Sequence, residues 1–133
     1  MKKVTVLLIT ILMMAVSLVG CGGNDDTIQT CIISNSSYSL QEELESANQE
    51  DALIVNEPVY ASVHFVESPK GMEYTVKWYL DGTEIKSETK ATEKDMQDIV
   101  VYELEAEQAA AGSLKLEVIY KDTILFTKEL IIQ

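Results

Sequence analysis

Apolar and polar side chains alternate along most of residues 27–133, and a period of two restricts such a chain to half-buried β-strands. The alternation is regular around Trp78, which shares one face with Val76 while Lys77 lies on the other. Asp81-Gly82 follows at once and predicts a tight hairpin turn. The pattern predicts strands at residues 27–34, 58–66, 73–80, 83–88, 98–106, 113–120 and 124–132.

Two segments break this alternation. Ser39 and Glu42 have the spacing of a capping box, which predicts one or two helical turns over residues 42–48. Residues 105–111 are rich in alanine and glutamate and are followed by Gly112, so a short helical turn is expected there. About seven short strands separated by turns favour an all-β fold, an antiparallel β-sandwich.

The N-terminal residues have the layout of a secretory signal. Lys2 and Lys3 precede an apolar run over residues 4–18, and the small residue Gly20 stands before Cys21. The Leu-Val-Gly-Cys end of this run resembles the lipobox of bacterial lipoproteins. The resemblance implies cleavage between Gly20 and Cys21, lipid on the sulfur of Cys21, and a mature chain anchored to a membrane on its extracytoplasmic face.

Two alternatives to a lipoprotein signal remain open for this segment. An uncleaved transmembrane anchor needs about 20 apolar residues, and the run here is shorter. An ordinary signal peptide without lipid is the other alternative. We therefore expect a cleaved signal peptide at residues 1–20, a lipidated polar tether at residues 21–26 and one domain at residues 27–133.

Two stretches of the domain resemble immunoglobulin-like domains of bacterial exported proteins. Residues 76–85, VKWYLDGTEI, resemble the central hairpin, in which a core tryptophan is followed by an Asp-Gly turn. Residues 111–120, AGSLKLEVIY, resemble the next-to-last strand, entered through a glycine. The resemblance implies an immunoglobulin-like β-sandwich over residues 27–133. The chain departs from the family in having no cysteine pair between the sheets, and in Leu114 where many such domains have the tyrosine of a tyrosine corner.

The charge is strongly negative. Ten lysines and no arginine stand against 22 acidic residues, a net charge of −12. Removal of residues 1–20 takes Lys2 and Lys3 away, so the mature charge is 8 − 22 = −14. This argues against nucleic acid as a partner, because phosphate binding requires lysine and arginine. Solubility through self-repulsion and attraction of a basic partner or cations both remain open.

Few residues carry potential chemistry. His64 is the sole histidine and lies on the strand face opposite Val63 and Phe65, so a solvent-facing or half-buried side chain is expected rather than a metal ligand or catalytic base. Three carboxylate pairs stand close in the sequence: Glu42 with Glu43, Glu103 with Glu105, and Glu105 with Glu107. Such pairs are expected by chance in a chain this acidic. We therefore predict no catalytic, cofactor-binding or metal-binding residues.

The two cysteines have different expected uses. If Cys21 carries lipid, Cys31 has no partner in the chain, and its place in the apolar run Cys-Ile-Ile predicts burial. A disulfide between Cys21 and Cys31 would exclude lipidation and is the alternative.

The aromatic residues divide by face. Tyr74, Trp78 and Tyr102 are expected in the core, whereas Tyr60 and Tyr79 lie opposite the apolar rows. The last two would be half-buried or would contact a protein or carbohydrate.

Three functions follow as hypotheses. The first is a lipid-anchored envelope protein that acts as a non-enzymatic binding or structural module, with a membrane contact through Cys21 and a protein partner of unknown identity. The second is an acidic inhibitor or immunity factor for a basic protein. An enzyme is the third and least favoured, because no catalytic motif is present.

Overall fold

The computed structural model describes residues 27–133, which form eight strands, a short α-helix and a 3₁₀ turn. The expected all-β class is confirmed. The elements are β1 (Ile28–Ser34), α2 (Gln41–Ser46), β2 (Ala52–Leu53), β3 (Val59–Ser68), β4 (Glu73–Leu80), β5 (Thr83–Ala91), β6 (Met96–Leu104), η1 (Ala106–Gln108), β7 (Gly112–Tyr120) and β8 (Thr123–Ile132).

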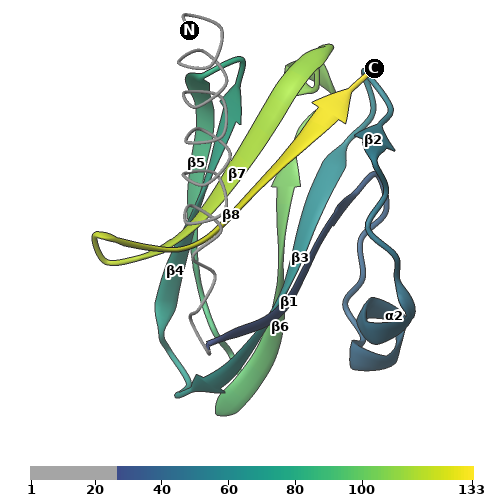
Figure 1. Cartoon of the computed structure of the whole chain (residues 1–133). Helices are drawn as coiled ribbons and strands as arrows, with labels where there is room; N and C mark the ends of the chain where they lie inside the picture. The colour runs from purple at the N-terminus through teal and green to yellow at the C-terminus, as the bar shows by residue number, and fades with distance from the viewer. Residues whose placement is uncertain (1–26) are drawn as a thin grey trace, which may run out of the picture.

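The strands form two sheets that face each other (Figure 1). One sheet has the order β1-β3-β6 and the other β2-β8-β7-β4-β5. The chain crosses from β3 to β4, returns from β5 to pair β6 with β3, and crosses again to pair β7 with β4. This arrangement is an immunoglobulin-like sandwich with one difference from constant-type immunoglobulin domains. In this protein the strand after β4, β5, pairs with β4 in the same sheet. In constant-type domains the strand at that place in the chain belongs to the opposite sheet.

The period-two pattern places the core as expected. Trp78 and Tyr102 have no exposed surface and Tyr74 only 2 %. The turn after β4 has positive φ at both central residues, 50° at Asp81 and 88° at Gly82, which matches the right-handed twist of a hairpin. Asp81 also accepts a hydrogen bond from the backbone N–H of Ser113 at 2.9 Å, so the hairpin is fastened to the start of β7.

Several element boundaries differ from the expectation. The two-residue strand β2 is absent from the predicted strands. The strand β5 continues to Ala91 rather than ending at residue 88, and β6 begins at Met96 rather than at residue 98. The capping box is wrong: Leu40 is the N-cap, and no side chain caps α2. The turn expected over residues 105–111 is confirmed as the shorter η1.

The prediction that His64 is solvent-facing or half-buried is wrong, because it is 2 % exposed. Its face is the outer one, as the alternation indicates, but that face is covered. Ser62, on the same face, is also buried and accepts a hydrogen bond from the N–H of Tyr38 in the loop that follows β1. The Nε2 atom of His64 lies 3.2 Å from Oε1 of Gln97. Alternation fixes the face of a strand residue, but not whether a distant loop covers that face.

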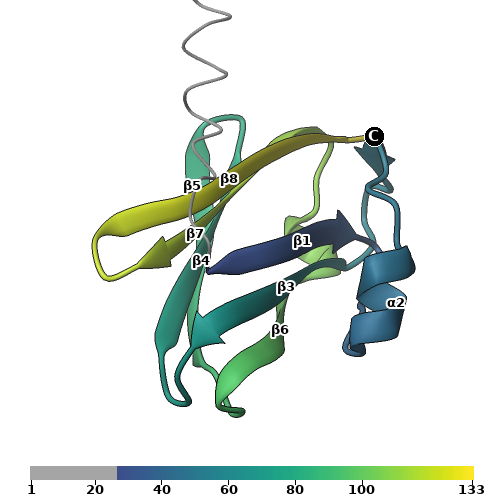
Figure 2. The same cartoon turned by 60° about the horizontal axis from the view of Figure 1, so that its bottom comes forward.

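The segment between β1 and β3 packs at one end of the three-stranded sheet, where α2 lies beside β1 and β3 (Figure 2). Leu44 of α2 is 1 % exposed. Gln49 pairs with the outer backbone of β1: its Oε1 accepts from Ile33 N–H at 2.9 Å and its Nε2 donates to Ile33 O at 2.8 Å. This side chain therefore replaces a neighbouring strand at that point.

The two sheets are joined by a buried polar contact at Tyr74. The hydroxyl of Tyr102 in β6 donates to the backbone carbonyl of Tyr74 in β4 at 2.9 Å. The Tyr74 hydroxyl lies 2.8 Å from that of Ser68, and its ring stacks on Phe65 with centroids 3.9 Å apart. Because the one cysteine in the described residues, Cys31, is unpaired, no disulfide within 27–133 joins the sheets.

Tyr102→Phe is expected to lower the free energy of unfolding by about 1–3 kcal/mol, because it removes a buried donor that satisfies a carbonyl of the facing sheet. Tyr60→Phe is the matched control, since Tyr60 is half-buried on the other face, and a change within about 0.5 kcal/mol is expected there. Urea unfolding measures both. Equal effects would show that the bond between the sheets does not contribute to stability.

Candidate binding site

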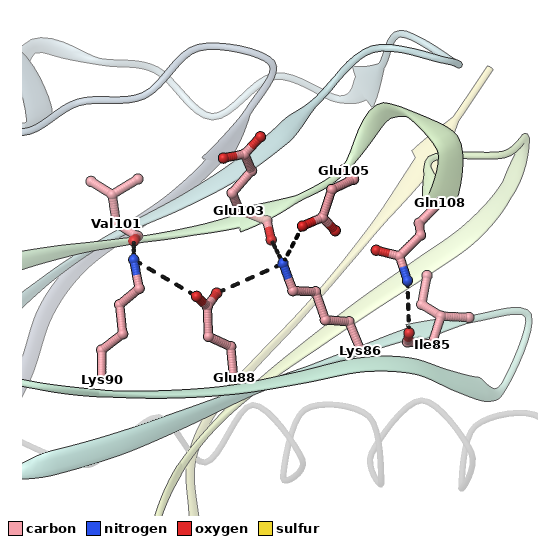
Figure 3. Close-up of polar contacts among 8 residues, drawn as sticks. All are labelled: Ile85, Lys86, Glu88, Lys90, Val101, Glu103, Glu105 and Gln108. Carbon is pink, nitrogen blue, oxygen red and sulfur yellow. Dashed lines mark hydrogen bonds and ion pairs between the residues drawn. The ribbon is translucent and has the colours of Figure 1, made fainter.

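An open sandwich has two sides where the edges of its sheets face each other, and the sides of this protein differ. On one side, β5 and β6 are joined by charged side chains (Figure 3). Lys86 donates to the backbone carbonyl of Glu103 and, at 2.9 Å, to the carboxylate of Glu105. Lys90 donates to the carbonyl of Val101 at 2.7 Å.

Further groups complete the closure of this side. The carboxylate of Glu88 lies between the two ammonium groups of Lys86 and Lys90, 3.9 Å from each. Gln108 donates to the carbonyl of Ile85 at 2.9 Å and so caps the outer edge of β5. The hydrogen bond from Lys86 lowers the pKa of Glu105, an exposed carboxyl. Inward-pointing charges of this kind keep an edge strand from pairing with another chain.

On the other side, a groove of about 380 Å³ lies between β1 and β8. Its lining is mixed: Ile28, Ile32, Leu125 and Phe126 are apolar, whereas Gln29, Thr30 and the half-buried Lys128 are polar. This volume is at the lower end of the range for small ligand sites, roughly 300–1,000 Å³.

Lys128 and Gln49 close one end of this groove. The ammonium of Lys128 donates to the carbonyl of Cys31 at 2.8 Å and to Oε1 of Gln49 at 3.1 Å. Burial lowers the pKa of Lys128 from its ordinary value. No ion pair joins Lys128 to a carboxylate of residues 27–133.

Cys31 lies beneath the groove and is 5 % exposed, so the expected burial is confirmed. Burial raises the pKa of its thiol from 9.0 to about 12, and the nearby Lys128 opposes this in small part. A thiol held in the neutral form is a poor nucleophile. Cys31 is therefore a core residue rather than a reactive one.

The other sequence predictions fall as follows. Gly20 and Cys21, the expected cleavage and lipidation residues, lie outside the described residues. Tyr60 and Tyr79 are half-buried, as expected for the faces they occupy. Tyr79 donates to the carboxylate of Glu117 at 2.9 Å, so its hydroxyl is used within its own sheet.

Sequence reasoning missed the lysines that close the two sides. One signal was available: Lys128 shares the inward parity of Phe126 and Leu130 in β8, so a charged residue stands in an apolar row. Gln49 had no such signal, because it lies in a loop and reaches a strand 16 residues away.

The described residues assemble no site for metal chemistry. Within 27–133, no three His, Cys, Asp or Glu side chains are grouped so that they could hold a metal ion. The same part of the chain has no helix long and apolar enough to span a membrane.

Comparisons with known proteins returned structures alone. No family model and no curated protein matches the sequence. An immunoglobulin-like protein from Pseudomonas aeruginosa is similar over 76 % of this chain and 91 % of its own, at 13 % identity and a TM-score of 0.46. A CARDB domain from Pyrococcus furiosus, solved with two metal ions, is similar over 81 % and 90 %, at 14 % identity and a TM-score of 0.40. A Niemann-Pick type C2 protein from the Japanese carpenter ant is similar over 83 % and 98 %, at 13 % identity and a TM-score of 0.45.

Cys31 is expected to make the protein less stable at alkaline pH. Because the thiol pKa is raised from 9.0 to about 12 on folding, the folded state holds a proton that the unfolded state has lost. The resulting stabilisation is fully present below pH 9 and is lost as the pH rises towards 12. Urea unfolding of the wild type and of Cys31→Ala over this range is the measurement.

The Cys31→Ala variant retains the alkaline dependence caused by Tyr102, whose pKa is also raised by burial. The comparison therefore isolates the thiol. Equal slopes of unfolding free energy against pH in the two proteins would contradict the burial of a neutral thiol.

Proposed function

We propose that this chain is a non-enzymatic binding module of the cell envelope, held to a membrane by lipid on Cys21. The observation that carries the binding role is the difference between the two sides of the sandwich. Lys86 and Lys90 close the β5–β6 side through bonds to β6 carbonyls and a salt bridge to Glu105, whereas a partly apolar groove lies between β1 and β8. On a common fold such as this, function depends on local sites of this kind.

The proposed anchor restricts where a partner can be met. Thr27, the first described residue, is six positions after Cys21. A fully extended chain spans at most ~3.5 Å per residue, so the domain would stay within about 20 Å of the bilayer. Two or more acyl chains are needed for stable anchoring, and a lipoprotein cysteine supplies them. The partner would therefore be a protein at the membrane surface.

Replacement of Cys21 by serine tests the anchor. The wild type is expected in the detergent phase of a detergent–water partition of cells and the Cys21→Ser variant in the aqueous phase, because the variant has no sulfur for the lipid. Cys31→Ser is the matched control and should stay in the detergent phase. A Cys21→Ser protein that remains with the detergent would overturn the proposed anchor.

Crosslinking in intact cells tests the binding role. Tagged wild type should capture one dominant protein, and Cys21→Ser should capture less of it because the domain is no longer held near the membrane. Capture unaffected by the substitution would separate binding from anchoring. Absence of any captured protein in both would contradict a protein-binding role.

A second candidate is an inhibitor or immunity factor for a basic protein, and the charge distribution favours it. No lysine lies between residues 27 and 69, where seven acidic residues lie. Three of the eight lysines of the domain, Lys86, Lys90 and Lys128, bond to backbone carbonyls of the facing sheet. No ion pair of the described residues reaches Glu42, Glu43 or Glu45, so the surface of α2 is acidic and would attract a cationic partner.

Electrostatic attraction predicts an association rate that depends on salt. The rate with the captured partner should fall about tenfold between roughly 0.05 and 0.5 M salt. Glu42→Gln/Glu43→Gln/Glu45→Gln should lower the rate at low salt. The matched control, with the same charge change at exposed residues elsewhere, is Glu73→Gln/Glu93→Gln/Glu107→Gln. Equal rates for the two triple variants would contradict a role of the α2 surface.

A further inference from the structure

The outer edge of β8, which faces away from β7, is paired with another strand only at its C-terminal end. Its last two residues pair with β2 in parallel, Ala52 beside Ile131 and Leu53 beside Ile132. Gln133 N–H then donates to Leu53 O at 2.9 Å, and Gln133 O accepts from Val55 N–H at 3.2 Å. A short segment of the chain is thus already added to this edge as an extra strand.

Along the rest of this edge, no strand of residues 27–133 pairs with β8. Backbone groups of a strand point alternately to its two neighbours. Since Gln133 points to β2, Thr127 and Glu129 point to the same outer side. Among residues 27–133, no strand pairs with β8 there, and no hydrogen bond reaches the outer N–H and C=O groups of these two residues. Unpaired edge groups of this kind are a template for another chain.

The outer edges of β1 and β5 are less suited to pairing with an added strand. The outer groups of β1 are occupied at Ile33 by Gln49, and the carbonyl of Cys31 by Lys128. On β5, Ser87 and Thr89 also point outward, but Lys86, Glu88 and Lys90 fill the space between β5 and β6. A strand added beside β5 would place its inward side chains against these charges. Beside β8 they would enter the groove.

The groove and its rim specify what such a strand would carry. Its inward side chains would meet Ile28, Leu125 and Phe126 beside the cationic Lys128, a lining that favours apolar over basic residues there. Its outward side chains would lie next to Glu129, which is exposed, and near Glu50 and Asp51, which precede β2. The described residues carry 8 lysines against 20 acidic residues, a net charge of −12. Basic outward residues complement this charge, and a second copy of the chain would be repelled.

We propose that the unpaired part of β8, Leu125–Glu129, binds an extended segment of a partner protein by strand addition, and that this segment alternates apolar and basic residues. The inference rests on the proposed binding function and names the mode of contact. The partner's backbone would pair with Thr127 and Glu129 in line with β2, and its apolar side chains would fill the groove beside β1.

The test uses the full chain, purified in detergent, and two synthetic peptides, one with alternating lysine and valine and one with alternating glutamate and valine. The lysine peptide should bind and slow the hydrogen exchange of the amide protons of Thr127 and Glu129, observed by NMR, because these protons gain carbonyl partners. The glutamate peptide should bind at least about tenfold more weakly. Equal affinity of the two peptides would overturn the proposed charge preference.

Proline substitution separates strand addition from other contacts. Thr127→Pro removes an outward N–H without breaking a bond to β7 and should weaken binding of the lysine peptide about tenfold or more. Ser87→Pro makes the same change on the edge of β5 and should leave affinity unchanged. Equal affinity of Thr127→Pro and the wild type, or exchange protection at Ser87 and Thr89 instead, would overturn the proposal.

Two further measurements keep the outcome decisive. Glu129→Lys leaves the backbone intact and should weaken the lysine peptide while strengthening the glutamate peptide, even if Thr127→Pro proves unstable. Dimers that form without peptide and vanish in Thr127→Pro would assign the edge to a second copy and overturn a partner segment. Failure of peptide binding while Cys21→Ser still loses its crosslinked protein would reject strand addition alone, not the binding function.

Discussion

Three lysines that point inward and bond to backbone carbonyls across the sandwich hold its open sides together. Lys86 and Lys90 of β5 reach the carbonyls of Glu103 and Val101 in β6, and Lys128 of β8 reaches that of Cys31 in β1. A charged donor makes a stronger hydrogen bond than a neutral one. No disulfide joins the sheets within residues 27–133, so these bonds link the sheets together with the contacts of Tyr74 with Tyr102 and Ser68.

This use of lysine also determines the outer electrostatics. Each ammonium that bonds a carbonyl of the facing sheet is held at the edge of the sandwich, where it reaches only the carboxylates beside it. Lys86 and Lys90 share Glu88, and Lys86 also bonds Glu105. No such pair neutralises the carboxylates of α2, Glu42, Glu43 and Glu45, in the described residues. Within residues 27–133, the carboxylates beside β5 are therefore paired with lysine, whereas those of α2 are not.

The sequence predicts what depends on neighbours along the chain. The strand at residues 73–80 and the Asp81-Gly82 turn are confirmed because alternation and positive φ are local properties. β2 could not be predicted, since two residues carry no period and their pairing partner, Ile131–Ile132, is far along the chain. The burial of Ser62, which lies on the same face as His64, and the contact of Gln49 with Ile33 have the same origin: a loop folds back onto a distant strand. The groove likewise depends on which two edges come to face each other.

The groove and the start of the described chain meet at β1. Ile28 lines the groove and follows Thr27, which is the described residue nearest to Cys21 in the sequence. If Cys21 carries lipid, as we propose, the same short stretch of chain both tethers the domain and forms one wall of its binding groove. A partner segment in the groove would then lie within the reach of the tether from the bilayer. For a partner in the same membrane, such a tether would replace a free encounter by one at a high effective concentration, and weak binding in the groove would then suffice.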